Sequence, residues 1–179
     1  ANILRPLGME HTSFSINDLS ADALVPLGLR DDDGNLSDVS ELMPTVTDGP
    51  YLGGGGLYSN VGDYMKFMRM VLRNGQGPDR EILRDDMVRD MFVNQIGDMQ
   101  VGYMPSQNPM LAKSHGWFEG NSMKWGYGLM VNETEVPGRR SAGAGAWSGL
   151  YNTFFSVDPA RGTACVIMMQ MLPVYNEAA

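Results

Sequence analysis

Apolar side chains recur with helical spacing in the segment after residue 58. They follow the i, i+3, i+4, i+7, i+8 order of an amphipathic helix. The apolar members are Tyr64, Phe67, Met68, Val71 and Leu72, and Lys66, Arg69 and Arg73 take the other side. Ser59 or Asn60 can cap the first turn, because their side-chain oxygens accept hydrogen bonds from free N–H groups. The Gly and Pro residues between Asn74 and Pro78 are typical of a helix end. The pattern therefore predicts one helix between these two signals.

The last third of the chain has the pattern of β-strands. Candidate strands cover residues 125–131, 141–147, 150–157 and 163–171. Short turns such as residues 158–162 join antiparallel strands. A second helix is predicted over residues 85–93, and residues 97–124 are predicted to form a long loop. Helices with an antiparallel sheet indicate an α+β fold class, in one domain over residues 1–179.

Two further features concern the backbone and the ends of the chain. The four consecutive glycines Gly53 to Gly56 do not suit the interior of a helix or strand, and they predict a tight crossing or a place where two backbones touch. The segments at Ala1 and at Ala179 both look like interior parts of a longer sequence. We therefore expect a partial domain, cut at both ends.

Charge and cysteine content narrow the classes of function. The formal net charge is −8 with three lysines, whereas nucleic-acid binding needs a clustered basic face, so no nucleic-acid partner is expected. No stretch approaches the ~20 continuous apolar residues of a membrane span. Cys165 is alone, so no intrachain disulfide forms, and we expect it to be a small buried hydrophobe. His11 and His115 lie far apart in the sequence, so no metal site is expected.

Searches for catalytic motifs give near misses. A nucleophile elbow needs Gly-x-Ser-x-Gly, and the run from Gly145 to Gly149 places its serine one residue late. No serine has a lysine three residues later, so the Ser-x-x-Lys pair of nucleophile and base is absent. Tyr58-Ser59-Asn60 matches Tyr-x-Asn by its letters, but it follows four glycines and opens the predicted helix. We interpret that match as a coincidence.

Four stretches, in order along the chain, resemble phrases of the serine β-lactamase-like proteins, specifically the class C β-lactamase and family VIII carboxylesterase group. Residues 2–14 are similar to I-x-x-P-L-G-M-x-x-T-x-F, and residues 53–67 to G-G-G-G-L-x-S-x-x-D-x-x-x-F. Residues 125–129 resemble the residues that begin a strand in these proteins, and residues 147–159 resemble the third active-site motif with the strand after it. The resemblance implies the C-terminal part of a β-lactamase/transpeptidase-like fold, an antiparallel sheet with packed helices.

The resemblance also implies acyl transfer through a serine acyl-enzyme. The family's Ser-x-x-Lys and Tyr-x-Asn motifs precede this portion, so the nucleophile is not expected on this chain. The third motif would be Trp147-Ser148-Gly149, a substrate-binding segment, followed by Leu150 as the backbone donor to the oxyanion. An ungapped count back from Pro159 instead puts Ala144-Gly145-Ala146 at the motif.

The third motif also bears on the substrate. Family β-lactamases usually have Lys-Thr-Gly there and family VIII esterases often have Trp-Gly-Gly, so the resemblance favours esters over penicillins. It implies no metal or organic cofactor.

Three functions stay open. The first is an esterase with weak activity on β-lactams, the second a penicillin-binding peptidase, and the third a non-catalytic binding module on the same fold. The expected partners are a small ester or β-lactam substrate and the N-terminal half of the same protein. We expect this chain alone to be inactive. The sequence leaves the compartment open between the bacterial cytoplasm and the periplasm.

Overall fold

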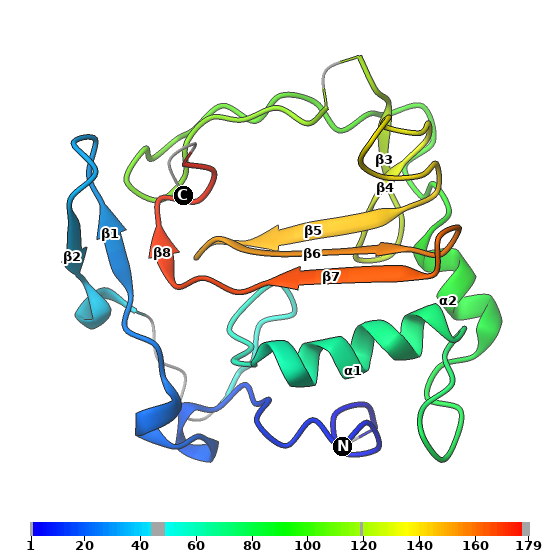
Figure 1. The fold of residues 1–179 in the computed structure, drawn as a ribbon, viewed down its shortest axis with the longest axis horizontal. Helices are drawn as coiled ribbons and strands as arrows, with labels where there is room; N and C mark the ends of the chain where they lie inside the picture. The colour runs from blue at the N-terminus through cyan, green and yellow to red at the C-terminus, as the bar shows by residue number, and fades with distance from the viewer. Residues whose placement is uncertain (1, 44–48, 119, 177–179) are drawn as a thin grey trace.

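The chain forms two β-sheets and two α-helices, as seen in a computed structural model that describes residues 2–43, 49–118 and 120–176 (Figure 1). The larger sheet has five antiparallel strands in the order β3-β4-β5-β6-β7. Its strands are β3 (Met123–Trp125), β4 (Met130–Asn132), β5 (Gly145–Gly149), β6 (Thr153–Asp158) and β7 (Thr163–Ile167). The expected α+β class with an antiparallel sheet is therefore confirmed. The terminal residues on which the expectation of cut ends rests, 1 and 177–179, lie outside the described residues.

The strand boundaries differ from the predicted ones where glycine or asparagine turns the backbone. Residues 125–131 do not form one strand but the hairpin of β3 and β4, because the chain reverses around Gly128, whose φ is +78°. The second strand begins at Gly145 rather than at residue 141, after a turn at Gly143 with φ +79°. The third begins at Thr153 rather than at residue 150, because Asn152 is left-handed at φ +58°.

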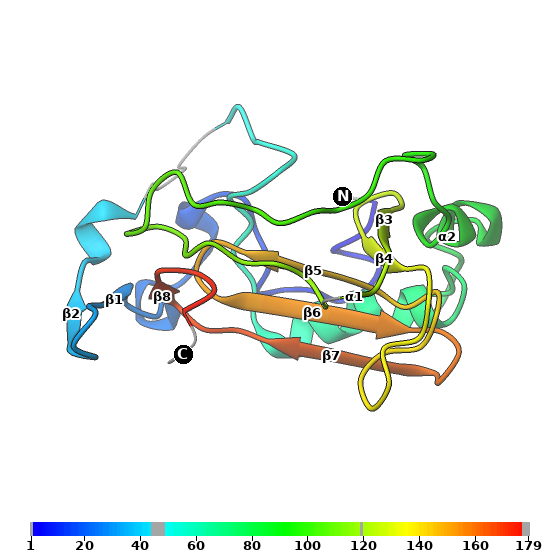
Figure 2. The ribbon, with the colours of Figure 1, turned by 90° about the horizontal axis from the view of Figure 1, so that it is seen from above.

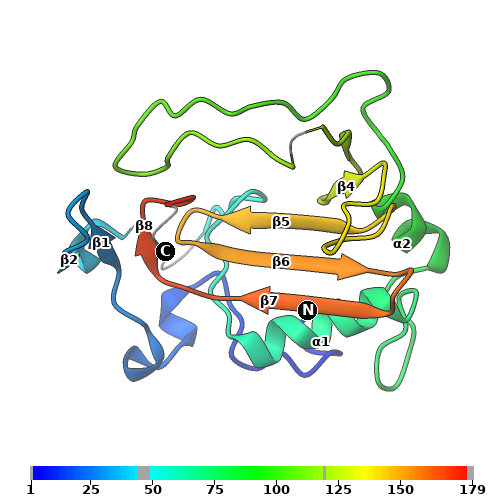
Figure 3. The ribbon, with the colours of Figure 1, turned by 45° about the horizontal axis from the view of Figure 1, so that its top comes forward.

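Helix α1 (Val61–Leu72) confirms the first sequence prediction. Asn60 is its N-cap, with Oδ1 accepting a hydrogen bond from the Asp63 N–H at 2.8 Å. The helix packs against β6 and β7, and the rings of Tyr64 and Phe155 lie 5.4 Å apart. Figure 3 shows α1 beneath the strands, on one side of the sheet. Helix α2 (Asp85–Met91) is two residues shorter than predicted, since Phe92 already has non-helical backbone angles.

The hydrophobic core lies between α1 and the larger sheet. Its buried members come from four distant segments and are Leu7, Met9, Met68, Met70, Val71, Val88 and Val157. The N-terminal segment is fixed here by Asp63, which accepts hydrogen bonds from the His11 N–H at 2.8 Å and the Thr12 hydroxyl at 3.0 Å. The first two resembling stretches of the sequence therefore meet in space and share one packing role.

The smaller sheet joins two segments near residue 30 to a strand close to the C-terminal end of the described chain. It consists of β2 (Leu36–Asp38), β1 (Gly28–Arg30) and β8 (Met171–Leu172), and β1 pairs with β8 in parallel. The predicted fourth strand, residues 163–171, is thus divided between β7 and this second sheet. Three short 3-10 helices, Ile16–Asp18, Ala21–Ala23 and Ser40–Leu42, complete this part of the chain.

Two expectations, one about Cys165 and one about the four glycines from Gly53 to Gly56, are wrong. Cys165 is exposed, because β7 turns Ala164 and Val166 toward the core and Thr163 and Cys165 away from it. Gly53 to Gly56 are exposed as well, and a Cβ added at any of them would meet no atom within 4 Å, so no second backbone touches them. Among the described residues, no helix has the length and apolar character needed to cross a membrane.

Candidate active site

The expected third motif, Trp147-Ser148-Gly149, lies at the C-terminal end of β5. It pairs there with residues 153–155 of β6, beyond the part of β5 that pairs with β4. Ala144-Gly145-Ala146, the other register, is buried, and a Cβ at Gly145 would come within 2.8 Å of Leu129. The structure thus places the first register at a partly exposed strand end and the second inside the fold.

Aromatic rings surround Trp147. The ring of Trp125 on β3 lies 4.5 Å from it in an edge-to-face arrangement, and the ring of Trp117 lies 5.6 Å away. Trp117 belongs to the long loop after α2, which runs beside β5 toward β8 and then returns to β3 (Figures 1 and 2). The three tryptophans therefore come together from two strands and a loop, and their tilted or edge-to-face rings form an apolar wall at the motif.

Ser148 makes a side-chain contact with the C-terminal segment. Its Oγ forms a short hydrogen bond with the Tyr175 hydroxyl, and the Tyr175 ring lies 5.9 Å from that of Phe154. Burial raises the pKa of Tyr175, although the bond to Ser148 opposes the shift. At neutral pH the phenol therefore keeps its proton, so it can orient Ser148 but is a poor base for it.

Asn152 holds Tyr175 in this position. Its buried side chain donates from Nδ2 to the carbonyl oxygens of Met171 at 3.0 Å and Pro173 at 2.9 Å. Its Oδ1 accepts from the Tyr175 N–H at 3.1 Å. Asparagine suits the left-handed turn because its short polar side chain bonds locally. One residue thus shapes the β5–β6 turn and fixes the segment that follows β8.

Gly149 and Leu150 complete the strand end. A Cβ on Gly149 would lie 2.3 Å from Thr153 Oγ1, so the position leaves no room for a side chain. Leu150 opens the turn, and 47% of its surface is exposed. Its backbone N–H makes no hydrogen bond within the described part of the chain. The turn therefore presents one unused backbone donor directly after the motif.

A cavity of about 610 Å³ adjoins this cluster. It is lined mainly by Tyr103, Lys113, Ser114, His115, Tyr175 and Asn176. The His115 ring stacks on that of Tyr175 with centroids 3.5 Å apart, and burial lowers the pKa of His115. Lys113 is paired with Asp32, Nζ to Oδ1 at 2.9 Å. Through Tyr175, the cavity shares a wall with Ser148.

The sequence alone did not point to His115, Trp117, Asn152 or Tyr175. His115, Trp117 and Tyr175 come from segments distant in the sequence, and Tyr175 lies 27 positions after its partner Ser148, whereas Asn152 lies in the turn that follows the motif. One local signal was present, because an asparagine between two β-rich runs favours a left-handed turn. Nothing local indicates which carbonyl groups its side chain would bind.

Tyr58-Ser59-Asn60 has structural roles, as interpreted from the sequence. The Tyr58 backbone bridges to Ser13, the Ser59 Oγ lies 2.8 Å from Thr12 Oγ1, and Asn60 caps α1. No group of three or more His, Cys, Asp or Glu side chains that could hold a metal occurs among the described residues.

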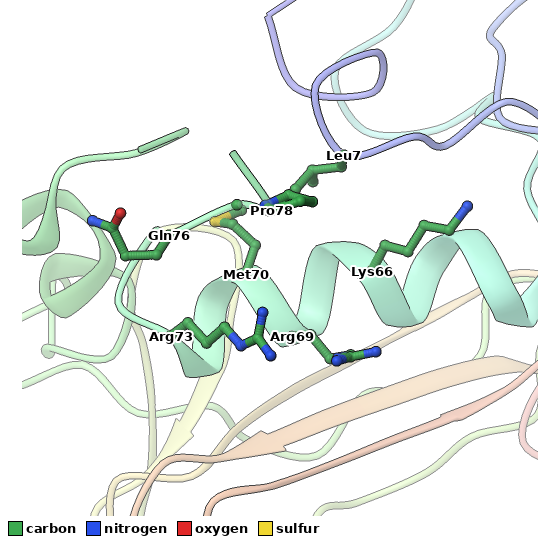
Figure 4. A pocket seen from close by; sticks show the side chains of 8 residues that line it. Leu7, Lys66, Arg69, Met70, Arg73, Gln76 and Pro78 are labelled. Carbon is green, nitrogen blue, oxygen red and sulfur yellow. The ribbon is translucent and has the colours of Figure 1, made fainter. Parts of the chain in front are cut away.

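A second, smaller hollow lies beside α1 and is basic. Its volume is about 200 Å³, and the cations along its rim are Lys66, Arg69 and Arg73. Figure 4 shows Lys66, Arg69 and Arg73 along α1, with Leu7 and Pro78 above the helix. None of these residues belongs to the cluster around Trp147, so this hollow is separate from the candidate active site.

Comparison with known proteins identifies relatives of this chain and structures that share its fold. Protein Rv1367c of Mycobacterium tuberculosis (strain ATCC 25618 / H37Rv) is 27% identical over 183 residues, which cover 96% of this chain and 42% of that protein. Among solved structures, unliganded simvastatin synthase (LovD) from Aspergillus terreus has a TM-score of 0.73 at 20% identity, covering 99% of this chain and 43% of that one. The chain thus spans less than half the length of these proteins.

Two further structures share the fold. EstCE1, described as a hydrolase with promiscuous acyltransferase activity, has a TM-score of 0.65 at 17% identity over 94% of this chain and 44% of its own. A penicillin-binding protein homologue from Caulobacter crescentus has a TM-score of 0.56 at 14% identity over 96% of this chain and 45% of its own. The beta-lactamase family model matches residues 1–178. The chain therefore belongs to the beta-lactamase family.

Proposed function

We propose that this chain forms the substrate-facing C-terminal part of a serine hydrolase that cleaves esters through an acyl-enzyme. The observation that carries the proposal is the position of Trp147-Ser148-Gly149. The motif ends β5 beside an aromatic wall, its Ser148 hydroxyl is held by Tyr175, and the next backbone N–H makes no hydrogen bond in the described part of the chain. A substrate carbonyl needs such an apolar surface together with preorganised donors.

The proposed reaction uses a serine supplied by residues outside this chain. That serine's oxygen attacks the ester carbonyl, and the alcohol leaves with a proton to give an acyl-serine. Water then adds to the acyl-serine and releases the carboxylic acid. In each tetrahedral intermediate, the Leu150 N–H donates to the oxygen that becomes negative, while Trp147 packs against the acyl part. Removing a single donor of this kind typically costs about 10²–10³-fold in kcat.

Two observations support an ester rather than a penicillin. The motif carries no lysine, so the cation that helps the family's β-lactamases hold a substrate carboxylate is absent from it. The cavity next to the motif has aromatic walls, and its one lysine is paired with Asp32. The penicillin-binding peptidase is the second candidate, favoured by the structural likeness to the Caulobacter protein.

The test compares two changes at Leu150 in the protein that carries this chain. Leu150→Pro removes the backbone N–H, and we expect kcat for p-nitrophenyl butyrate to fall about 10²–10³-fold. Leu150→Ala keeps the N–H and should stay within a few-fold of wild type. Circular dichroism and thermal melting check that both variants are folded. Equal activity of the two variants would contradict the role of this N–H.

A second pair of variants tests whether the Ser148 hydroxyl contributes to kcat/KM. Ser148→Ala removes the hydroxyl bonded to Tyr175, and we expect kcat/KM to fall about 5–100-fold, which corresponds to one lost hydrogen bond. Ser156→Ala, on the neighbouring strand β6, is the matched control, and its kcat/KM should change little.

The 179-residue chain alone should give no turnover. Slow, stable labelling by a fluorescent penicillin without ester hydrolysis would support the peptidase, and absence of both would support a binding module.

A further inference from the structure

We propose that Arg140 is a positioning residue for the aromatic wall beside the motif. Acting through the ring of Phe118, it holds Trp117 against the motif, where the acyl part of an ester would pack. The inference rests on the proposed ester hydrolysis and names a residue that sets how tightly the acyl part binds. Trp117 and Phe118 are neighbours in the long loop. The Trp117 ring lies 5.6 Å from that of Trp147, whereas the Phe118 ring is covered by two arginine side chains.

The two guanidinium groups over the Phe118 ring differ in their distance from it and in their exposure. The Arg140 Cζ lies 4.8 Å from the ring centroid, and the Arg139 Cζ lies 5.4 Å from it. A guanidinium within about 6 Å of a ring centroid is attracted to the ring face, and the attraction grows when water is excluded. Arg139 is exposed, whereas Arg140 is half-buried and its buried Nε has no hydrogen-bond partner in the described part of the chain. We therefore assign the stronger attraction to Arg140.

The charge of Arg140 faces this ring rather than a carboxylate. Arg140 forms no ion pair in the described part of the chain, whereas Arg161 pairs with Glu135 at 3.1 Å. Burial lowers the pKa of Arg140, but a guanidinium keeps its proton in proteins, so the charge remains. Among the described residues, the ring of Phe118 is therefore the group that compensates this half-buried charge.

The β4–β5 connection (residues 133–144), which carries both arginines, is fixed at two places. On the side of the sheet, Arg161 donates from Nη1 to the Arg139 carbonyl oxygen at 3.2 Å. On the side of the long loop, the Glu133 N–H donates to the Ser122 carbonyl oxygen at 3.0 Å. The arginines thus project from a backbone that is already anchored, so they can hold the loop in place.

Holding Trp117 in place before binding lowers the cost of binding the acyl part. A wall whose rings are already ordered loses little conformational freedom when an acyl chain packs on it. Without Arg140, the Trp117 ring would have to be ordered as the substrate binds. That cost falls on binding and not on the chemical step, so it raises KM and leaves kcat unchanged. A longer acyl chain covers more of the wall, and its KM should therefore rise more than that of an acetate.

The experiment measures KM and kcat of the protein that carries this chain for p-nitrophenyl hexanoate and p-nitrophenyl acetate. Arg140→Met removes the charge and keeps an unbranched side chain. We expect KM for the hexanoate to rise about 2–30-fold, the range of a lost cation–π contact, with kcat unchanged and KM for the acetate little changed. Arg80→Met makes the same change of charge at an exposed position between α1 and α2, and should leave both KM values as they are. An unchanged KM in Arg140→Met, or an equal rise for both esters, would overturn the proposal.

Variants of Phe118 test whether Arg140 acts through this ring. Phe118→Leu should raise KM for the hexanoate, and adding Arg140→Met should have no further effect, because the contact is already lost. Phe118→Tyr keeps the ring face and should behave like the wild type. Additive effects of Phe118→Leu and Arg140→Met would show that the arginine acts by another route, which contradicts the proposal.

A binding measurement distinguishes this inference from the proposed function. Fluorine-19 NMR of protein labelled with 5-fluorotryptophan follows the Trp117 ring, whose resonance is identified by its loss in Trp117→Phe. In Arg140→Met we expect this resonance to move toward that of free 5-fluorotryptophan, and hexanoate titrated on the same signal to bind about 2–30-fold more weakly. If both changes occur but neither ester is hydrolysed, the positioning role stands and the hydrolase proposal fails. If the resonance stays in place, or moves without a change in hexanoate binding, the positioning role fails whether or not the esters are hydrolysed.

Discussion

Replacing Asn152 with alanine tests whether one buried side chain holds the C-terminal segment against the candidate active site. The change removes three hydrogen bonds, to the Met171 and Pro173 carbonyl groups and from the Tyr175 N–H. At about 1 kcal/mol for each bond, the loss is about 3 kcal/mol. The left-handed backbone at φ +58° adds about 1 kcal/mol, because alanine tolerates it less well than asparagine. We therefore expect the free energy of unfolding to fall by about 4 kcal/mol.

Asn74→Ala is the matched control for this experiment. Asn74 is also left-handed, at φ +53°, but it is exposed and its side chain makes no hydrogen bond in the described part of the chain. It should lose only the backbone contribution of about 1 kcal/mol. Urea unfolding followed by tryptophan fluorescence measures both variants. The difference between them should be about 3 kcal/mol, and a difference below about 1 kcal/mol would refute the assignment of these bonds as a clamp.

Three further predictions concern single sites. Burial alone would raise the pKa of Asp63, but its hydrogen bonds and the Lys66 charge hold that pKa below its usual value. The stability that these interactions give to the fold is therefore present above about pH 4 and is lost as pH falls through the lowered pKa. Asp63→Asn should therefore flatten the acid limb of a stability–pH profile, and an unchanged limb would contradict the assignment. Gly149→Ala should destabilise by about 1–3 kcal/mol in urea unfolding, and adding Thr153→Ala should restore part of the loss; a neutral single variant would contradict the clash. Cys165 should react with a thiol reagent in the native protein, whereas a reaction seen only after denaturation would mean that other residues cover β7.

The sequence predicted best what is local. The apolar stripe and the Asn60 cap identified α1, because helical periodicity and capping depend on residues within one or two turns. The order of the resembling stretches indicated the family and the fold. Strand limits were less accurate, since single residues such as Gly128 and Asn152 decide where the backbone turns.

The surroundings of the motif depend on contacts between distant segments. His115 was considered only as a metal ligand, although the structure stacks its ring on Tyr175 at the edge of the site. That arrangement follows from Asn152 and from the pairing of the loop with the C-terminal segment, where Ala112 bridges to Val174. The order of apolar and polar residues along the chain does not indicate which distant segments pair. Cys165 shows the same limit, because an apolar run does not reveal which of its alternating side chains faces outward.

The parallel pairing of β1 with β8 has a consequence for how the chain is made. Gly28 faces Met171 and Leu29 faces Leu172, so the partners are about 140 residues apart along the sequence. At about 5–20 residues per second, a ribosome needs roughly 7 to 30 s to produce β8 after β1. During that time β2 is the one described strand that can pair with β1, and the edge that β8 will occupy stays available to chaperones or to neighbouring nascent chains. Closing so long a loop also raises the contact order, and folding is expected to be slow compared with that of a helical protein of equal size.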